Sequence, residues 1–204
     1  MPKKVVIIGA GGHAKVIADI VLLNGDNLVG FLDDSDEKQG SEIFKGYKVI
    51  GRVSEADEYS DDHFVIAIGD NHTRAQIAES LNVKFYTAVH PTAVIADTVK
   101  IGEGTVIMAG SIINPDTTIG KHCIINTLCS IDHDNHIEDY VHISPGAHLA
   151  GTVSVGKHSW ICTGASIINN ISVSSDAIIG AGATVIKNIE NTGTYVGTPA
   201  RRVK

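Results

Sequence analysis

The sequence is poor in aromatic residues, in cysteine and in positive charge. Aromatic side chains make up 5% of the 204 residues, which suits a narrow aliphatic core better than an ordinary sandwich. The formal net charge is −7 and no basic face is evident, so we expect no nucleic-acid binding. The apolar run at residues 1–12 is short and ends in glycines, so we expect neither a signal peptide nor insertion into a membrane.

Cysteine occurs only at Cys123, Cys129 and Cys162. An odd number without a C-x-x-C pair argues against a disulfide framework and against a structural zinc site. Cys123 and Cys129 stand at a small, inward-facing position of the repeat described next, so we interpret them as buried hydrophobic residues. The cysteine pattern favours a cytoplasmic location.

An unbroken six-residue repeat of aliphatic residues runs from Ile95 to Val185. A helix repeats near 3.6 residues and a strand at 2, whereas a period of six is typical of a hexapeptide-repeat parallel β-helix. A small or β-branched residue stands two places before nearly every aliphatic one, so we predict that both positions point inward. Glycine often follows the aliphatic residue, as at Gly102 and Gly120, which suits a tight corner. Three hexads would make one triangular coil.

The residues before the repeat alternate between strand and helix patterns, which predicts a small α/β domain with a parallel sheet. We expect strands at residues 4–9, 28–32 and 64–69, with helices after the first strand and from residue 71 to about 81. Residues 35–62 read as a loop with a short strand at 49–50. Residues 84–91 link this domain to the repeat.

A glycine turn, Gly9-x-Gly11-x-x-Ala14, follows the first strand. Such a turn lets backbone N–H groups approach a phosphate at a helix N-terminus, although it can also be only a tight turn. The domain is too small for the two halves that bind NAD, so one nucleotide fits better. Asp33 and Asp34 end the second strand as candidate acceptors from a base or ribose, and Gly69-Asp-Asn71 should line the same crevice.

Six of the ten histidines lie in the repeat, at His122, His133, His136, His142, His148 and His158. The repeat also departs from its own pattern here, because the small inward position becomes Asn135, and such departures favour function. Asp132-His133-Asp134 places a base between two carboxylates, which would hold its tautomer and raise its basicity. The alternative is that each histidine is a solvated corner residue.

A zinc site is a second interpretation of these histidines, since some β-helix proteins are zinc-dependent carbonic anhydrases. His136, His142 and His148 are six residues apart, which sends them to three different faces of a triangular coil. They therefore cannot converge within one chain, and we predict no metal site.

The residues near the carboxyl end offer a third candidate site. The small residues at 180–185 would leave a smooth outer surface for a long, thin ligand. Arg201, Arg202 and Lys204 would then meet its phosphates, unless they form only a solvated basic terminus.

Several motifs together resemble the bacterial sugar O- and N-acyltransferases, a hexapeptide-repeat family that includes bacillosamine- and perosamine-type N-acetyltransferases and the sialic-acid O-acetyltransferase. They are GAGGHA at 9–14, FLDD at 31–34, AIGDNHTR at 67–74, NTLCSIDHD at 126–134, HISPGAHLAG at 142–151 and VGTPARRV at 196–203.

The resemblance implies a Rossmann-like nucleotide-sugar-binding domain at residues 1–86, a left-handed parallel β-helix acyltransferase domain at residues 90–189, and a tail at residues 190–204 that contributes to a coenzyme A site. It also implies a homotrimer with active sites between subunits. Acetyl-CoA would be the cosubstrate, and no cofactor would be permanently bound.

Roles for individual residues follow from the same resemblance. His133 matches the general base, with Asp134 as its acidic neighbour and Asn126 as a positioning residue. The acetyl-CoA site would comprise His142, Gly151, Gly180 and Pro199. The nucleotide-sugar site would comprise Gly11, Gly12, His13, Asp33, Asp34, Gly69, Asn71 and Arg74.

The implied reaction is N-acetylation of a nucleotide-linked amino sugar, at C4 in most relatives, by direct attack on the thioester. The alternatives left open are O-acetylation of sialic acid or a capsular sugar, a zinc-dependent β-helix hydrolyase, and a non-catalytic nucleotide-sugar binder.

Overall fold

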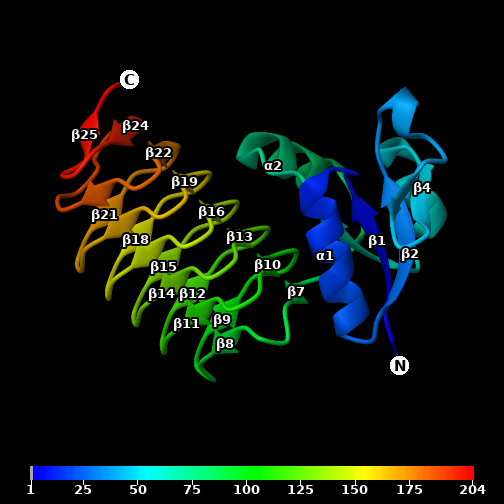
Figure 1. Cartoon of the computed structure of the whole chain (residues 1–204), viewed down its shortest axis with the longest axis horizontal. Helices are drawn as coiled ribbons and strands as arrows, with labels where there is room; N and C mark the ends of the chain where they lie inside the picture. The colour runs from blue at the N-terminus through cyan, green and yellow to red at the C-terminus, as the bar shows by residue number, and fades with distance from the viewer. Residues whose placement is uncertain (1) are drawn as a thin grey trace. The chain divides into compact units, whose positions relative to one another are not determined.

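The computed structural model describes residues 2–204, and the chain forms two compact units, Met1–Pro91 and Thr92–Lys204. Buried apolar residues form a core in each unit, and Figure 1 shows the elements of both. Within residues 2–204, no helix combines the length and the hydrophobicity needed to cross a membrane.

The first unit is built on a six-stranded sheet in the order β3-β4-β2-β1-β5-β6. All neighbouring pairs are parallel except β3 and β4. The apolar run at the start of the chain becomes β1, and its residues from Val5 to Ile8 are fully buried at the centre of the sheet. The strands are β1 (Lys4–Ile8), β2 (Asn27–Leu32), β3 (Glu42–Phe44), β4 (Tyr47–Gly51), β5 (His63–Ile66) and β6 (Lys84–Phe85).

Two helices follow β1 and β5, as the sequence predicts. Helix α1 (Gly12–Leu23) buries an apolar stripe that includes Ile17 and Val21, and it ends before Gly25, whose positive φ stops the helix. Helix α2 (Asn71–Ser80) begins after Asp70, whose carboxylate caps it by accepting the Thr73 N–H at 2.8 Å.

Two expectations for this unit were wrong. Residues 35–62 are not mainly loop, because they contain β3, β4 and the short 3-10 helices η1 (Asp36–Lys38) and η2 (Val53–Tyr59). Residues 84–91 are not only a linker, because β6 adds the sixth strand to the sheet and is followed by β7 (Ala88–Val89). Strands of two or three residues carry too little alternation to be recognised in a sequence.

The second unit is a parallel β-helix with three sheets, one on each face of the coil. Face 1 contains β10 (Val106–Ile107), β13 (Ile124–Ile125), β16 (His142–Ile143), β19 (Trp160–Ile161) and β22 (Ala177–Ile179). Face 2 contains β8 (Val94–Ile95), β11 (Ile112–Ile113), β14 (Ser130–Ile131), β17 (His148–Leu149), β20 (Ser166–Ile167) and β23 (Thr184–Val185). Face 3 contains β9 (Lys100–Ile101), β12 (Thr118–Ile119), β15 (His136–Ile137), β18 (Ser154–Val155) and β21 (Ser172–Val173).

Each strand pairs in parallel with the strand three hexads away, as Ile113 pairs with Ile131 and Ile125 with Ile143. The triangular coil of three hexads is therefore confirmed. Both inward positions are confirmed too, since the aliphatic residues of the repeat from Ile107 to Val185 are buried, and so are the small residues between Thr105 and Ala183.

The corners have a period of their own. Every sixth residue from Gly104 to Gly182 has a positive φ, and most of these residues are not glycine. The glycines that follow the aliphatic position have a different reason to be glycine, because none of them has a positive φ. A Cβ at Gly102 would meet the Gly120 backbone, and one at Gly156 would meet the Ser175 backbone. Close stacking of successive coils, not turn geometry, excludes a side chain there.

The carboxyl-terminal residues do not leave the β-helix, although they leave the six-residue repeat. Strand β24 (Gly193–Val196) pairs in parallel with β22, and β25 (Arg201–Arg202) folds back antiparallel on β24. The tail therefore extends face 1, with exposed arginines at 201 and 202.

Candidate active site

His133 lies on the corner between β14 and β15, with Asp134 next to it at φ 58°. The His133 backbone N–H donates to Asp132 Oδ1 at 2.9 Å, and the Asn114 side chain donates to the same oxygen at 2.9 Å. These two hydrogen bonds lower the pKa of Asp132, which keeps its carboxylate ionised beside the corner.

The imidazole of His133 forms a dyad with Asp134. Its Nδ1 lies 2.7 Å from Asp134 Oδ2, and both side chains are more than half exposed, at 56% and 57%. This hydrogen bond raises the pKa of His133 above its ordinary value, and the charges of Asp132 and Asp134 act in the same direction. Because an ionised carboxylate only accepts, Nδ1 carries the proton and the neutral ring has its lone pair on Nε2. Such an imidazole has the protonation state that a general base requires.

Gly151 lies directly against this ring, on the same corner one coil later. A Cβ on Gly151 would be 2.6 Å from His133 Cε1 and 2.7 Å from Nε2, which is closer than atoms can approach. The Thr152 N–H donates to the His133 carbonyl at 2.9 Å, so the neighbouring coil holds the His133 backbone as well. The absence of a side chain at position 151 therefore leaves space for the His133 imidazole.

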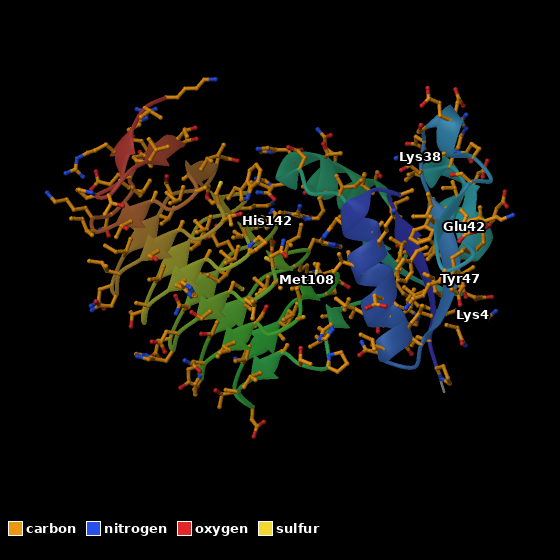
Figure 2. All side chains as sticks on the ribbon, viewed as in Figure 1. Lys4, Lys38, Glu42, Tyr47, Met108 and His142 are labelled. Carbon is orange, nitrogen blue, oxygen red and sulfur yellow. The ribbon has the colours of Figure 1, made fainter. Side chains whose placement is uncertain are left out.

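A second polar group surrounds His142, a residue of β16 on face 1 that is labelled in Figure 2. The Asn126 amide lies 3.2 Å from His142 Nε2, so it donates to that nitrogen. The His142 ring stacks on Trp160 with centroids 5.6 Å apart and planes 6° from parallel. The Trp160 Nε1–H donates to Ser144 Oγ at 2.7 Å, which fixes the indole. His142 is thus a well-oriented, nearly buried imidazole.

The structure brings Asn126 and His142 together but places His133 elsewhere in the same chain. Asn126 and His142 belong to face 1, whereas His133 stands at the far end of face 2, where β14 ends. The dyad therefore lies on the corner that follows face 2, whereas His142 lies on face 1.

The prediction that His136, His142 and His148 diverge is confirmed, because they lie in β15, β16 and β17, on three different faces. A zinc site made of these three histidines of one chain is excluded.

A surface pocket of about 440 Å³ lies on face 2, between the two corners. Its polar lining includes Asp132 and the pair Ser130–His148, whose Oγ and Nδ1 are 2.8 Å apart. The lining residues are Asn114, Ser130, Asp132, His148, Leu149, Ala150, Ser166, Ile167, Ile168 and Asn169. This pocket shares Asp132 with the His133 corner and Ala150 with the Gly151 corner.

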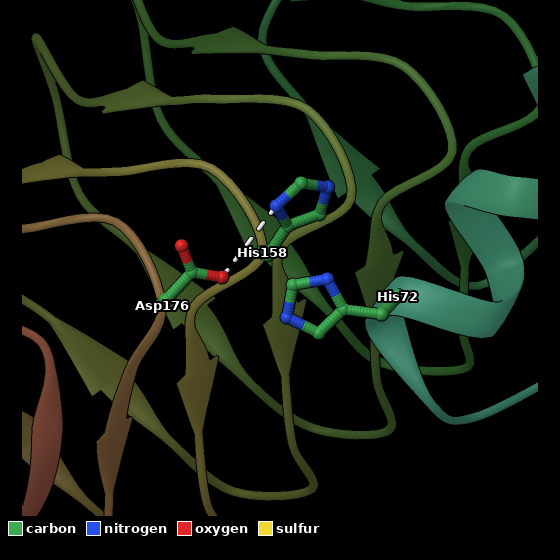
Figure 3. A group of neighbouring side chains, drawn as sticks. All are labelled: His72, His158 and Asp176. Carbon is green, nitrogen blue, oxygen red and sulfur yellow. Dashed lines mark ion pairs between the residues drawn. The ribbon is translucent and has the colours of Figure 1, made fainter.

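His122 and His158, the remaining histidines of the repeat, belong to a stacked column on the third set of corners. Tyr140 stacks between them, with ring centroids 5.5 Å from His122 and 5.4 Å from His158. His158 Nδ1 lies 3.6 Å from Asp176 Oδ1, an ion pair if the imidazole is protonated (Figure 3). These residues follow one another at the positive-φ position of successive coils.

Asp33 holds the glycine turn of the first unit in place. Its Oδ2 accepts the Ala10 N–H at 2.8 Å and the Lys38 ammonium at 3.0 Å, and its Oδ1 accepts the Ser35 N–H at 3.0 Å. Partial burial opposes ionisation, but these hydrogen bonds prevail and lower the pKa of Asp33. Oδ2 thus ties the glycine turn, through Ala10, to the end of β2, whereas Oδ1 holds the segment that follows β2. Contact of Asp33 with a ligand remains a prediction.

Two other polar residues expected in this crevice, His13 and Arg74, are largely buried in the first unit. Burial, with a smaller effect of the Arg74 guanidinium, lowers the pKa of His13 to about 4, so its imidazole is neutral. Arg74 is 1% exposed and donates to the Ile68 and Gly69 carbonyls at 2.9 and 3.2 Å and to Asn71 Oδ1 at 2.7 Å. Arg74 therefore braces the residues between β5 and α2.

Asp34 and the carboxyl-terminal candidates are located as follows. Asp34 Oδ1 accepts the Val53 N–H at 3.0 Å. The Gly180 N–H donates to the Tyr195 carbonyl at 2.8 Å, which ties face 1 to β24. Pro199 lies in the turn between β24 and β25, and the arginines at 201 and 202 are exposed.

None of the three thiols is prepared to act as a nucleophile. Burial raises the pKa of Cys129 to about 11 and also raises the pKa of Cys162. Cys123 and Cys129 are buried in the coil, as predicted. Since the thiolate is the reactive form, these groups are inert near neutral pH.

Two family models match the chain: the PglD N-terminal domain at residues 4–81 and the bacterial transferase hexapeptide (six repeats) at residues 98–133. The acetyltransferase domain of PglB from Neisseria gonorrhoeae, solved with acetyl coenzyme A, is 34% identical with a TM-score of 0.92, and all of both chains is covered. PerB from Caulobacter crescentus, solved with CoA and GDP-perosamine, is 33% identical with a TM-score of 0.91, over 98% of this chain and 97% of that one. The chain belongs to the bacterial hexapeptide sugar acyltransferases.

Curated relatives of the chain match over shorter stretches. UDP-N-acetylbacillosamine N-acetyltransferase of Bacillus subtilis is 44% identical over 101 residues, which are 46% of each chain. An uncharacterised protein of Acanthamoeba polyphaga mimivirus is 35% identical over 93 residues, 45% of this chain and 18% of that protein. The chain thus spans less than half of the curated relatives it matches.

Sequence reasoning missed two residues of the His133 and His142 groups, Asn114 and Trp160, and one role of a third, Asp132. Asn114 stands one full coil before Asp132, so the 18-residue spacing already pairs them once a triangular coil is assumed. Trp160 stands one coil after His142 in the same way. Asp132 was noted only for its charge, and nothing in the sequence indicates that its oxygen holds the His133 backbone.

Proposed function

We propose that the chain is an acetyl-CoA-dependent N-acetyltransferase that acts on the amino group of a nucleotide-linked amino sugar. The His133–Asp134 dyad carries the proposal, because it offers an exposed, oriented base at a coil corner. The similarity to an N-acetyltransferase and to structures solved with CoA and GDP-perosamine or with acetyl-CoA supports the same reaction class.

The reaction is a direct transfer in a ternary complex. The sugar nitrogen attacks the thioester carbonyl, a C–N bond forms, and the nitrogen gains positive charge. His133 Nε2 accepts the proton from the nitrogen. Collapse of the tetrahedral intermediate breaks the C–S bond, and the imidazolium returns the proton to the sulfur, so that CoA leaves as the thiol. General-base help of this kind contributes about 10²–10⁴ in rate. The protonated thiols argue against an acyl-enzyme intermediate.

The oxyanion of the intermediate needs a hydrogen-bond donor near the base. We propose the backbone N–H of Gly151 for this role, because this residue contacts the His133 ring. His142, oriented by Asn126 and Trp160, would contact the thioester from the other side.

The separation of these groups within one chain supports a site shared between chains. His133 ends face 2, and His142 lies on face 1, so a neighbouring copy is needed to bring an imidazole of each kind to one thioester. A closed ring of three copies would form three such sites. We therefore propose a homotrimer with its active sites between subunits.

The ligands are assigned to the parts of the chain as follows. We propose that residues 1–86 hold the nucleotide sugar, residues 90–189 the reacting groups, and residues 190–204 part of the coenzyme. For the nucleotide sugar, backbone N–H groups at Gly11 and Gly12 fit a phosphate, because α1 begins there. The proposed contacts are completed by His13, Asp33, Asp34, Gly69, Asn71 and Arg74.

For acetyl-CoA, Gly180 and Pro199 would line the path of the coenzyme and the arginines at 201 and 202 would meet its phosphates. Acetyl-CoA and nucleotide sugars, the proposed substrates of the protein, are metabolites of the cytoplasm. We therefore propose a cytoplasmic location.

One experiment tests the function. The protein is incubated with acetyl-CoA and UDP-, GDP- or dTDP-linked amino sugars, with the matching hydroxy sugars as controls. Thiol release and the mass of the product are followed. We expect transfer to at least one amino sugar and none to its hydroxy analogue. Transfer only to hydroxyl groups would replace the proposal by O-acetylation, and no thiol release with any acceptor would leave a non-catalytic binder.

A further inference from the structure

The buried side chain of Asn135 ties the catalytic corner together from below. Its Nδ2 lies 2.6, 3.0 and 3.2 Å from the carbonyls of Asp132, Ala150 and His133, and its two N–H groups serve all three oxygens, one of them as a shared hydrogen bond. Its Oδ1 accepts the Val153 N–H at 3.1 Å. The residue is 1% exposed and faces the inside of the coil. It therefore cannot touch a substrate, yet it holds the backbone on both sides of the His133 peptide.

The same inward position elsewhere in the β-helix shows what an ordinary residue does there. The Thr105 hydroxyl donates to the Gly120 carbonyl at 2.8 Å and accepts the Cys123 N–H at 3.0 Å. Ser159 does the same with the Ser174 carbonyl at 2.8 Å and the Ala177 N–H at 3.2 Å. One hydroxyl thus donates to a carbonyl of the next coil, 15 residues later, and accepts an N–H of that same coil, 18 residues later.

Asn135 reproduces both bonds, to Ala150 and from Val153, and adds two that a hydroxyl does not make. The added contacts reach the Asp132 carbonyl, which also accepts from the Thr117 hydroxyl at 2.8 Å, and the His133 carbonyl, at the corner that carries the base. The coil itself does not need them, because Thr105 and Ser159 close their coils with a hydroxyl. The extra amide is specific to the coil with the dyad.

We propose that Asn135 is a positioning residue for His133, which it serves by fixing the backbone of the corner from inside the coil. The inference rests on the proposed function, in which His133 is the base. With the His133 carbonyl held by Asn135 and Thr152, the peptide cannot rotate. The imidazole is then kept both against Gly151 and on Asp134.

The test replaces Asn135 by Ser, which keeps a hydroxyl for Ala150 and Val153 but removes the two added bonds. Thr105→Ala is the matched control, because it removes two inner hydrogen bonds of the same kind in a coil without the dyad. For Asn135→Ser we expect kcat to fall at least about 10-fold, since a misplacement of 1 Å is able to cost about 10²-fold. We expect KM for acetyl-CoA to stay within about twofold of the wild-type value. Thr105→Ala should keep the wild-type kcat, whatever melting temperature it has.

A second readout does not depend on acetyl transfer. The titration of the His133 imidazole is followed by NMR in the wild type and in Asn135→Ser, with His133→Gln to assign the signal. We expect the pKa of His133 to fall toward its ordinary value in the variant, because the ring leaves Asp134.

An unchanged His133 titration with an unchanged kcat in Asn135→Ser would overturn the inference. The inference would also be overturned if Thr105→Ala lost kcat as well, and if the loss of kcat in both variants followed their loss of stability. Failure of the proposed function is distinguishable, because the wild-type protein would then transfer no acetyl group. The NMR comparison would still show whether Asn135→Ser changes the pKa of His133.

Discussion

Replacement of Gly151 by Ala should separate catalysis from stability. The new Cβ would lie 2.6 Å from His133 Cε1, about 1 Å inside ordinary contact distance. Gly151 has no positive φ, so alanine brings no backbone strain. The atoms in the way are the tip of a side chain that is 56% exposed, and such a tip is free to swing toward solvent. The ring would then leave Asp134 and the reacting atoms.

We expect this variant to keep its melting temperature within a few degrees while kcat falls by about 10²-fold, the cost of misplacing a catalytic group by about 1 Å. KM for the nucleotide sugar should change little, because the loss is in the transition state. The assays are thiol release for kcat and thermal unfolding for stability.

Gly156→Ala is the opposite control. Its Cβ would meet the Ser175 backbone, which cannot swing away, and the site is remote from His133 in the coil. Overpacking of this kind costs about 1–3 kcal/mol, and each kcal/mol lowers the melting temperature by about 2–4 °C in a domain of this size. Its kcat per folded molecule should remain that of the wild type. A Gly151→Ala enzyme with full kcat would refute the placement of the base against this glycine.

Three further variants test the chemistry. His133→Ala should lower kcat at least about 10²-fold with nucleotide-sugar binding retained, as measured by calorimetry; near-normal turnover would move the base elsewhere. Asp134→Asn should shift the rising limb of kcat/KM to lower pH, because the amide no longer stabilises the imidazolium and the pKa of His133 falls; a limb at the wild-type pH would show that the dyad does not set this pKa. Cys129→Ala should stay active, and a folded but inactive variant would argue for a covalent intermediate.

The six-residue repeat was sufficient to predict the coil, its three faces and both inward positions, because each coil repeats the same packing. The repeat was not sufficient to explain why residue 102 is glycine, because the backbone that excludes a side chain there belongs to Gly120, in the next coil and 18 residues later. The same limit applies to Asn114, which meets Asp132 only in the folded coil.

The candidate site was predictable in its residue types and less so in its geometry. The Asp132-His133-Asp134 pattern indicated a base with carboxylates, but not that one carboxylate holds the ring and the other the backbone. Asp33 was expected to face a ligand, and its hydrogen bonds to Ala10 and Lys38 depend on contacts that no local pattern contains. The separation of His133 from His142 became visible only when the strands were assigned to faces.

Mixing two inactive variants tests the central claim most directly, namely that His133 of one chain works with His142 of the next. His133→Ala and His142→Ala chains are co-expressed in equal amounts, purified and assayed for acetyl transfer. In a closed ring of three, about a quarter of the sites would combine the intact His133 of one chain with the intact His142 of its neighbour. The account predicts recovery of about that fraction of the wild-type rate, while each variant alone stays inactive. A mixed preparation as inactive as its components would contradict it.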